Sequence, residues 1–216
     1  TPHDPRALRN AFGSFMTGVT VVTAFDSTHC PIGFTANSFT SVSLEPPLVL
    51  VCLAKTSQNY DAFVKAAGFA INVLSEKQID LSNTFARPSD DRFANVSWQA
   101  GPKVAPILAD VCAWFDCAMH KVVEAGDHEI LIGEVAAFDQ TVTAGLGYAQ
   151  GAYVTPATTA AALEQSTNLL ISTLIERDGE VLLLEDGTGG LALPEQKVDG
   201  DGASAAAKKL LASTGL

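Results

Sequence analysis

Short apolar segments rich in β-branched residues recur along the chain, and tight-turn residues separate them. Such segments suit a pleated, half-buried surface, whereas parallel strands need crossovers of a dozen or more residues between them. Most connections in this chain look too short for such crossovers. We therefore expect a mainly β fold, an antiparallel barrel with peripheral helices, with strands near residues 19–23, 32–34, 41–44, 48–53, 69–74, within 111–123, and 130–138.

Helices and one domain boundary complete the expected organisation. Asp4 followed by Pro5 is a good helix start, and shorter helices fit residues 59–66 and 76–85. After Tyr153 a run of small residues is typical of a linker. We place a first domain at 1–154, a linker at 155–168 and a small α/β appendage at 169–216, with strands near 169–175 and 181–184 and a final helix at 205–216.

The charge of the chain argues against two classes of partner. The formal net charge is -11, from 24 acidic and 13 basic residues, so the surface that binds nucleic acid or an anionic membrane is absent. The longest apolar run, Leu48–Ala54, is too short to cross a bilayer, and the first residues lack a signal pattern. We expect a soluble, cytoplasmic protein with neither nucleic acid nor membrane as a partner.

Motifs for metals and for bound phosphate are missing from the sequence. Cysteines 30, 52, 112 and 117 have no zinc-type spacing, so we expect buried free thiols and no metal site. No Gly-x-Gly-x-x-Gly or Gly-x-x-x-x-Gly-Lys loop follows a strand, which argues against a Rossmann or P-loop site. No catalytic triad or carboxylate pair stands out either. If the chain is an enzyme, a cofactor carries the chemistry.

The uncharged polar segment Thr35–Ser38, continued by Thr40, Ser41 and Ser43, lies between apolar strands. Its small side chains would let a planar ligand approach the backbone, and its hydroxyls and amide could pair with the polar edge of a flat heterocycle. An ordinary Ser/Thr-rich turn explains the same residues, and on spacing alone it is the better interpretation.

Two further segments could contact a ligand. Lys55, Thr56 and Ser57 follow an apolar strand, so a cation and two hydroxyls could hold a phosphate there, although a solvated strand end fits equally well. His128 follows Gly126-Asp127 at a turn, where an imidazole could orient a ligand. A surface turn histidine is the more common case.

Taken in order, several segments resemble the flavin reductase family that serves two-component flavin monooxygenases. The resemblance runs from about Arg6 to Tyr153, and the Thr-Ala-Asn-Ser and Ser-x-Ser-x-x-Pro-Pro segments carry most of its specificity. The matching segments are Thr17–Thr23, Gly33–Phe39, Ser41–Val49, Phe69–Leu74, Gly126–His128 and Ile132–Val135.

This resemblance implies a split β-barrel of the Greek-key, FMN-binding type, a homodimer, and hydride transfer from NADH or NADPH to FMN or FAD. Reduced flavin would then pass to a partner monooxygenase. The resemblance places His128 near the nicotinamide as the catalytic residue. It assigns flavin contacts to Thr35, Ala36, Asn37 and Ser38 at the ring, Ser43 at the ribityl or ring region, Cys52, Leu53, Ala54, Lys55 and Ser57 on the phosphate side, and Phe85 and Ala86 in a closing segment.

Two regions depart from the family pattern. Leu146–Tyr153 lacks the basic stretch that relatives often carry there, so arginine contacts at this position are not expected. The tail resembles the first half of a Nudix hydrolase domain, with Lys208 and Lys209 at the Arg-Glu of the Nudix pattern and Ala212 and Ser213 at its Glu-Glu, so the metal-binding carboxylates are missing. We therefore expect no hydrolase activity from the appendage, and a structural or dimerising role instead.

The sequence leaves two alternative functions open. The chain could be a flavin-binding module without turnover, in which the tail blocks the nicotinamide site. It could also be an oxidoreductase that retains its flavin and reduces another acceptor. The residues do not choose between FMN and FAD or between NADH and NADPH.

Overall fold

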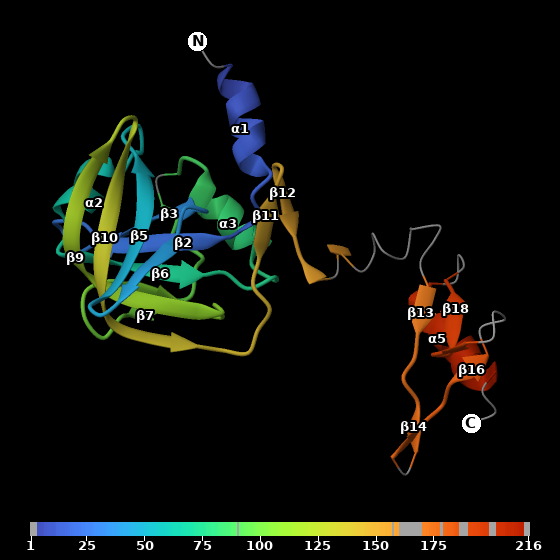
Figure 1. Ribbon diagram of the computed structural model, residues 1–216. Helices are drawn as coiled ribbons and strands as arrows, with labels where there is room; N and C mark the ends of the chain where they lie inside the picture. Colours follow the sequence, from blue (N-terminus) through green and yellow to red (C-terminus); the bar gives the residue numbers. More distant parts are fainter. Residues whose placement is uncertain are drawn as a thin grey trace. The chain divides into compact units, whose positions relative to one another are not determined.

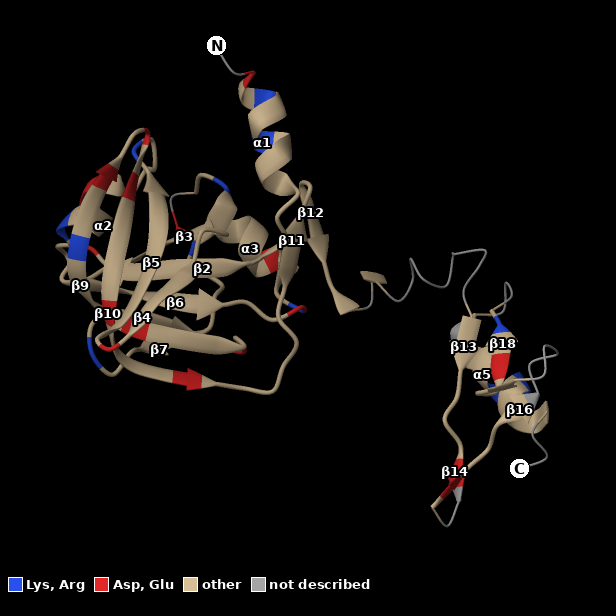
Figure 2. Ribbon diagram, in the orientation of Figure 1, with Lys and Arg blue, Asp and Glu red and all other residues tan. Residues whose placement is uncertain are grey.

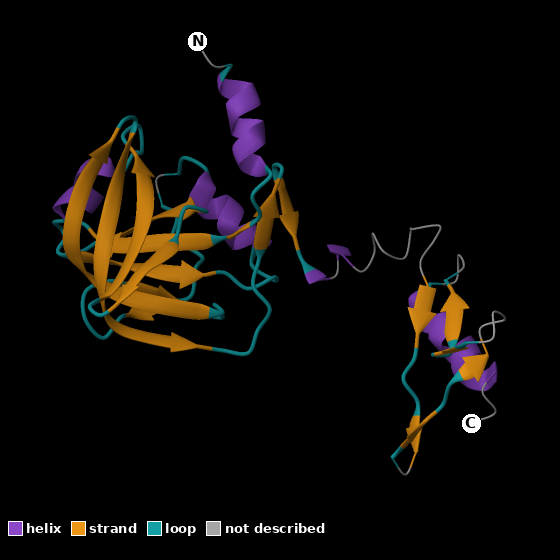
Figure 3. Ribbon diagram, in the orientation of Figure 1, coloured by secondary structure: helices purple, strands orange, loops and turns teal. Residues whose placement is uncertain are grey.

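The computed structural model describes residues 4–89, 91–156, 158–159, 170–177, 179–185, 190–198 and 202–213. The chain forms two compact units, which divide between Thr155 and Pro156. Figure 3 shows the first unit as mostly strands, with short helices at its periphery. No helix among these residues is long and apolar enough to cross a membrane.

The elements of the first unit follow one another closely along the chain (Figure 1). In order they are α1 (Pro5–Gly13), β1 (Thr17–Gly18), β2 (Thr20–Phe25), β3 (Pro31–Ala36), β4 (Thr40–Leu44), β5 (Pro47–Ala54), α2 (Tyr60–Lys65), β6 (Gly68–Val73), α3 (Ile79–Ala86), β7 (Trp98–Ala100), β8 (Pro106–Leu108), β9 (Ala113–Ala125), β10 (His128–Gln140), β11 (Gly147–Ala149) and β12 (Ala152–Val154).

A seven-stranded antiparallel sheet forms the body of the first unit. Its strand order is β3-β2-β6-β9-β10-β5-β4, and no described pairing joins β3 to β4. Only residues 37–39 connect these two edge strands, so the sheet must curl until its edges lie near each other. The result is a barrel split between β3 and β4, which confirms the expected fold class. A smaller sheet, β1-β11-β12, and the pair β7-β8 accompany it.

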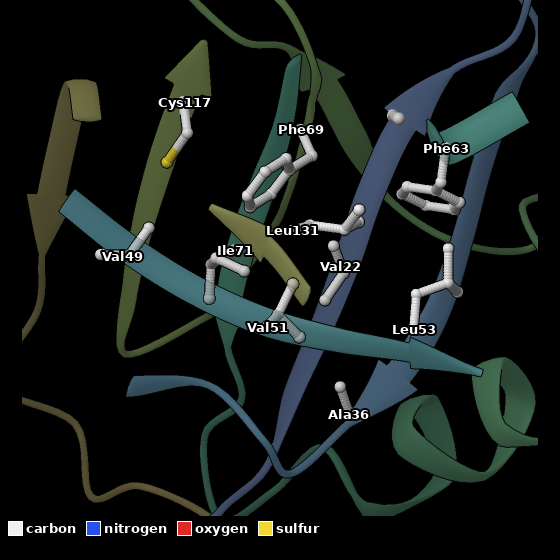
Figure 4. Packing of buried hydrophobic residues seen from close by; sticks show 11 residues of the cluster. Val22, Ala36, Val49, Val51, Leu53, Phe63, Phe69, Ile71, Cys117 and Leu131 are labelled. Carbon is white, nitrogen blue, oxygen red and sulfur yellow. The ribbon is translucent and has the colours of Figure 1, made fainter. Parts of the chain in front are cut away.

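The interior of the barrel is filled by one face of each strand. Along β5 the buried positions alternate with more exposed ones, as the period of a half-buried strand requires. Val49, Val51 and Leu53 therefore point inward, where they join Val22 and Ala36 from the opposite edge of the sheet. Figure 4 shows these side chains converging with others of the same cluster. The shared core holds the two edges together without hydrogen bonds between β3 and β4.

The helices begin where local chemistry predicts. The side chain of Asp4 caps α1 by accepting a hydrogen bond from the backbone N–H of Arg6 at 2.9 Å, and Pro5 occupies the first turn. In α3, Phe85 is buried beneath Gly33 of β3. A Cβ at position 33 would lie 2.7 Å from the Phe85 ring, so only glycine permits this close packing.

One expectation about the cysteines is wrong. Cys112 and Cys117 are buried free thiols and Cys52 is half-buried, but Cys30 is exposed. It lies in the β2–β3 loop, where the Asp26 carboxylate accepts the backbone N–H groups of Thr28 and Cys30 and so forms a polar surface turn. Burial raises the pKa of the Cys117 thiol to about 12, which keeps it protonated and unreactive.

The second unit contains small β pairs and one helix. Its elements are β13 (Leu170–Ser172), β14 (Glu176–Arg177), β15 (Glu180–Val181), β16 (Leu184–Glu185), β17 (Leu191–Ala192), β18 (Glu195–Lys197) and α5 (Ala203–Ser213). Val198, Ala206 and Leu210 are its buried apolar residues among those described. The expected linker at 155–168 lies largely outside the described residues, as do 214–216 of the predicted final helix. The Nudix resemblance stays a prediction.

Candidate functional site

A cavity of about 460 Å³ opens where β3 and β5 end, beside the C-terminal end of α3 and the first residue of β10. It gathers all the predicted site residues except Ser43 and Lys55. The lining residues are Phe34, Thr35, Ala36, Asn37, Ser38, Cys52, Leu53, Ala54, Thr56, Ser57, Gln58, Phe85, Ala86, Pro88, Arg92 and His128.

The polar segment at the end of β3 is braced from several sides. The Thr35 hydroxyl donates to the backbone oxygen of Ser82 at 2.6 Å, and the Thr20 hydroxyl donates to the Ala36 oxygen at 2.9 Å. The Ser38 hydroxyl accepts a hydrogen bond from the Cys52 N–H at 2.9 Å. These bonds fix the backbone that faces the cavity, and within the described structure the exposed Asn37 amide has no hydrogen-bond partner. The segment is therefore a rigid wall with a free amide at its rim.

The opposite wall is the turn after β5. The Ser57 N–H donates to the Ala54 oxygen at 2.9 Å, which folds the turn back toward the cavity. The side chains of Thr56, Ser57 and Gln58 line the cavity and make no hydrogen bonds with described residues. Three neighbouring polar side chains are thus available to a ligand.

Lys55, which was expected on the phosphate side, is held elsewhere. Its Nζ lies 2.8 Å from Glu124 and 3.8 Å from Glu129, and the Tyr60 hydroxyl donates to Glu129 at 3.0 Å. The hydrogen bond to Glu124 raises the pKa of Lys55 and lowers the pKa of Glu124. Two carboxylates of the β9–β10 hairpin thus hold this lysine, and it is not among the residues that line the cavity.

Arg92 supplies the positive charge that Lys55 does not. Its Nη1 donates to the Gly33 oxygen at 2.7 Å and its Nε to the Arg87 oxygen at 2.9 Å. Burial lowers the pKa of Arg92 from its ordinary value, although an arginine remains charged at neutral pH. No Asp or Glu is among the described residues that line this cavity. An anionic ligand would therefore meet one fixed cation and no carboxylate, in a chain whose net charge is -11.

His128 reaches the cavity through the register of the β9–β10 hairpin. Gly126 adopts a φ of 69° in the turn, a left-handed conformation that favours glycine, and His128 then pairs with Ala54 of β5. Its Nδ1 lies 2.7 Å from the Asp127 carboxylate, and this hydrogen bond lowers the pKa of Asp127. A carboxylate can only accept here, so Nδ1 carries the proton and Nε2 of the neutral ring is the acceptor.

Ser43 lies apart from this site. It is on β4 opposite Leu48, while Cys52 to Ala54 are at the other end of β5. Its hydroxyl accepts the Glu45 N–H at 3.2 Å, a bond local to the β4–β5 turn. No group of three or more His, Cys, Asp and Glu side chains able to hold a metal occurs anywhere in the described structure.

The cavity has the properties that a flavin would require. Small side chains at Ala36, Ser38 and Ala54 leave room for a flat ring beside the backbone, and Leu53 and Phe85 supply apolar surface. Gln58 of the turn after β5 and Arg92 also line a small neighbouring hollow together, so the cation lies near this turn. An apolar slot with a cationic, hydroxyl-lined end fits a planar heterocycle that carries a phosphate.

Comparisons with known proteins agree with this geometry. The family described as "Flavin reductase like domain" matches residues 12–157. A "Probable flavin reductase" of Rhizobium meliloti is 54% identical over 216 residues, covering 99% of this chain and 69% of the relative. The reductase component of the flavin-dependent trigonelline monooxygenase of Acinetobacter baylyi is 51% identical over 208 residues, 96% of this chain and 67% of the relative.

A solved structure extends the agreement to three dimensions. The NADH:FAD oxidoreductase SgcE6 of Streptomyces globisporus, in complex with NAD and FAD fragments, superposes with a TM-score of 0.68 at 41% identity, over 72% of this chain and 94% of that chain. The family match spans most of the chain, and it includes every element that lines the cavity. The chain therefore belongs to the flavin reductase family.

Proposed function

We propose that the cavity at the ends of β3 and β5 binds FMN or FAD, and that NADH or NADPH delivers a hydride to the flavin there. The observation that carries this proposal is the convergence of Thr35–Ser38, Cys52–Ala54, Phe85 and His128 from distant parts of the chain on one cavity without described carboxylates. Family membership makes the chain a flavin reductase. The proposal assigns that activity to this cavity.

The ring would lie against the backbone of Thr35 to Asn37. The Asn37 amide and the Ser38 hydroxyl, which still has its own proton to donate, would pair with the polar edge of the ring. Leu53 and Phe85 would exclude water from one side, and the absence of bulk at Ala36 and Ala54 allows close approach.

The phosphate would lie at the turn after β5. Thr56, Ser57 and Gln58 present free side chains there, and Arg92 supplies a charge-assisted donor. Lys55 stays paired with Glu124, so we assign it no direct contact. Ser43 is likewise left out, because it lies near the other end of β5.

A bound flavin supplies the acceptor for a hydride from a reduced nicotinamide. Such a direct transfer needs alignment of the two rings more than it needs a protein acid or base. The braced wall formed by Thr35 and Ser38 provides a fixed platform for that alignment. His128 would accept a hydrogen bond through Nε2 and so orient the donor, with Asp127 holding its tautomer.

We further propose that the reduced flavin serves a partner oxygenase and that the chain acts as a homodimer. The relative from Acinetobacter baylyi is the reductase component of a monooxygenase, which supports the first point. Exposed apolar side chains on the sheet edge β4 and near the end of β10 support the second, among them Val42, Leu44, Phe138 and Val142.

Oxidation of NADH and of NADPH, followed by absorbance with FMN, with FAD and without added flavin, tests the proposed function. We expect rapid oxidation that depends on added flavin. A protein that retains flavin but oxidises neither nucleotide would instead be a binding module. Slow turnover of added flavin by a protein that stays yellow through gel filtration would indicate a different acceptor.

A further inference from the structure

We propose that a second cavity, between α1 and the β11–β12 hairpin, binds the adenylate half of a dinucleotide. This inference rests on the proposed function, because it takes the first cavity as the flavin site. Adenylate is the part that FAD and the nicotinamide dinucleotides have in common. The cavity has a volume of about 680 Å³ and is lined by Arg9, Asn10, Phe12, Gly13, Phe15, Thr17, Asn37, Tyr148, Gln150 and Gly151.

The second cavity lies next to the flavin cavity, and the two share a lining residue. Asn37 lines both of them. A smaller hollow of about 250 Å³ adjoins each: it shares Thr35, Ala36, Asn37 and Ala86 with the flavin cavity, and Asn37 and Tyr148 with the second cavity. A ligand made of two linked nucleotides would therefore find a second compartment next to the first.

The chemistry of the second cavity suits an adenylate. Phe12, Phe15 and Tyr148 offer aromatic surfaces on which a base could stack, and Asn10 and Gln150 offer amides for its polar edge. Arg9 offers a guanidinium for the phosphate. The described lining contains no Asp or Glu. Figure 2 shows two basic bands on α1, which are Arg6 and Arg9, and the helix has no acidic residue.

One buried polar atom in the wall of this cavity lacks a partner. The hydroxyl oxygen of Thr17 is buried, and within the described structure it makes no hydrogen bond. A buried hydroxyl without a partner costs stability unless something else satisfies it. Thr17 lines the second cavity, but its hydroxyl oxygen is sealed from solvent, so it could bond to a polar group of an occupant only after the side chain rotates.

The walls are held in place without a ligand. The Gln150 N–H donates to the Gly13 oxygen at 2.8 Å, which joins the end of α1 to the hairpin turn (Figure 1). The rings of Tyr148 and Tyr153 meet edge to face at 5.5 Å. The Tyr153 hydroxyl lies 2.9 Å from that of Ser82 and 3.0 Å from the Asn83 side-chain oxygen, which ties the hairpin to α3. The second cavity is therefore preformed, which lowers the entropy cost of binding.

The variant Arg9→Gln tests the proposal, with Arg6→Gln as its matched control. Both arginines are exposed on α1. Arg6 is not among the residues that line the flavin cavity, the second cavity or the smaller hollow that adjoins them. The Kd values of FMN and FAD are measured by fluorescence titration. With FMN as acceptor, the KM values of NADH and of reduced nicotinamide mononucleotide are measured as well. FAD differs from FMN, and NADH from reduced nicotinamide mononucleotide, only by the adenylate half.

If the adenylate belongs to FAD, Arg9→Gln raises the ratio of the FAD Kd to the FMN Kd about tenfold, the expected effect of losing one charge-assisted contact. If it belongs to the nicotinamide dinucleotide, the same variant raises the ratio of the two KM values instead. In either case Arg6→Gln leaves both ratios at their wild-type values.

Unchanged ratios in Arg9→Gln, or equal changes in Arg6→Gln, would overturn the proposal. So would a loss of dimer in Arg9→Gln without a change in either ratio, which would identify this surface as a subunit contact. Failure of the wild-type chain to oxidise either NADH or NADPH with any flavin would refute the proposed function itself. The two failures are therefore distinguishable.

Discussion

The hydroxyl of Ser38 accepts a hydrogen bond from the backbone N–H of Cys52 at 2.9 Å. Ser38 follows β3 and Cys52 lies in β5, the neighbour of the other edge strand, so this bond crosses the split in the barrel. Both residues line the cavity assigned to the flavin. The bond thus fixes the distance between two walls of the site at the point where the sheet itself is open.

Replacement of Ser38 by alanine tests the importance of this bond. The Cys52 N–H loses its partner in a half-buried position, which costs about 1 kcal/mol of stability. We expect the flavin Kd to rise roughly fivefold, the equivalent of about 1 kcal/mol. Ser41→Ala on β4 is the control, because Ser41 is exposed and outside the cavity. An unchanged flavin Kd in Ser38→Ala would show that the wall is held by other contacts.

A phosphate contact of Arg92 can be told apart from its bracing of Gly33 by comparing the Kd of FMN with that of riboflavin, which lacks the phosphate. In Arg92→Gln we expect the Kd of FMN to rise about tenfold more than that of riboflavin, because a charge-assisted contact is lost only with FMN. Fluorescence titration measures both values, and the exposed neighbour Arg87→Gln serves as the control. Equal losses for the two ligands would mean that Arg92 acts only by bracing Gly33.

For His128 the expected effect is on the nicotinamide rather than on the flavin. In His128→Ala we expect a raised KM for NADH or NADPH, or slower hydride transfer in rapid-mixing experiments, with flavin affinity little changed. His120→Ala on β9 is a matched control, since its ring lies near Glu134 and outside the cavity. Loss of flavin binding with normal nicotinamide kinetics would refute the assignment.

The packing of β3 on α3 predicts an unequal response of two glycines. In Gly33→Ala the new Cβ would lie 2.7 Å from the Phe85 ring and 3.1 Å from the Val22 oxygen. We therefore expect the free energy of unfolding to fall by about 1–3 kcal/mol. In Gly18→Ala nothing lies within 4 Å of the new Cβ, and stability should stay nearly constant. Urea denaturation measures both. Equal stabilities would contradict the close approach of β3 and α3.

Asp116 gives the first unit a pH dependence of known sign. It is fully buried on β9, where its carboxylate accepts the N–H groups of Lys103 and Val104. Burial raises the pKa of Asp116, and these hydrogen bonds offset the effect only in part. Between the ordinary and the raised pKa the folded chain holds more protons than the unfolded chain, so this residue's contribution to stability falls as pH rises through that window.

The comparison of wild type with Asp116→Asn isolates this contribution. We expect the unfolding free energy of wild type minus that of the variant to fall as the pH rises from about 4. Urea denaturation at a series of pH values measures the difference. A difference that grows with pH would mean that the backbone donors lower the pKa of Asp116 instead.

Most of the barrel could be predicted from periodicity and turn residues. Each of the seven expected strands corresponds to one of β2, β3, β4, β5, β6, β9 and β10, and the three expected helices to α1, α2 and α3. The short strands β1, β7, β8, β11 and β12 were not expected, because two or three residues carry too little alternation to be recognised.

Local pattern indicated Thr35–Ser38 and His128 as candidates, and the family resemblance added Phe85 and Ala86 from a distant segment. Thr35 to Ser38 and Cys52 to Ala54 stand at strand ends, and the family resemblance pointed to them. No sequence motif indicated that Arg92 belongs to the site, because it comes from an irregular loop and is held at the cavity by a hydrogen bond to the Gly33 oxygen. Lys55 was expected on the phosphate side, but it pairs with Glu124 of the β9–β10 hairpin and does not line the cavity, which spacing along the sequence does not reveal.

A crystal structure of the chain with FMN would locate the flavin. We expect the isoalloxazine ring against the backbone of Thr35 to Asn37, and the phosphate beside Ser57 and Arg92. FMN bound elsewhere, for example in the separate cavity of about 750 Å³ that His29, Lys65 and Lys103 help to line, would refute the proposed flavin site.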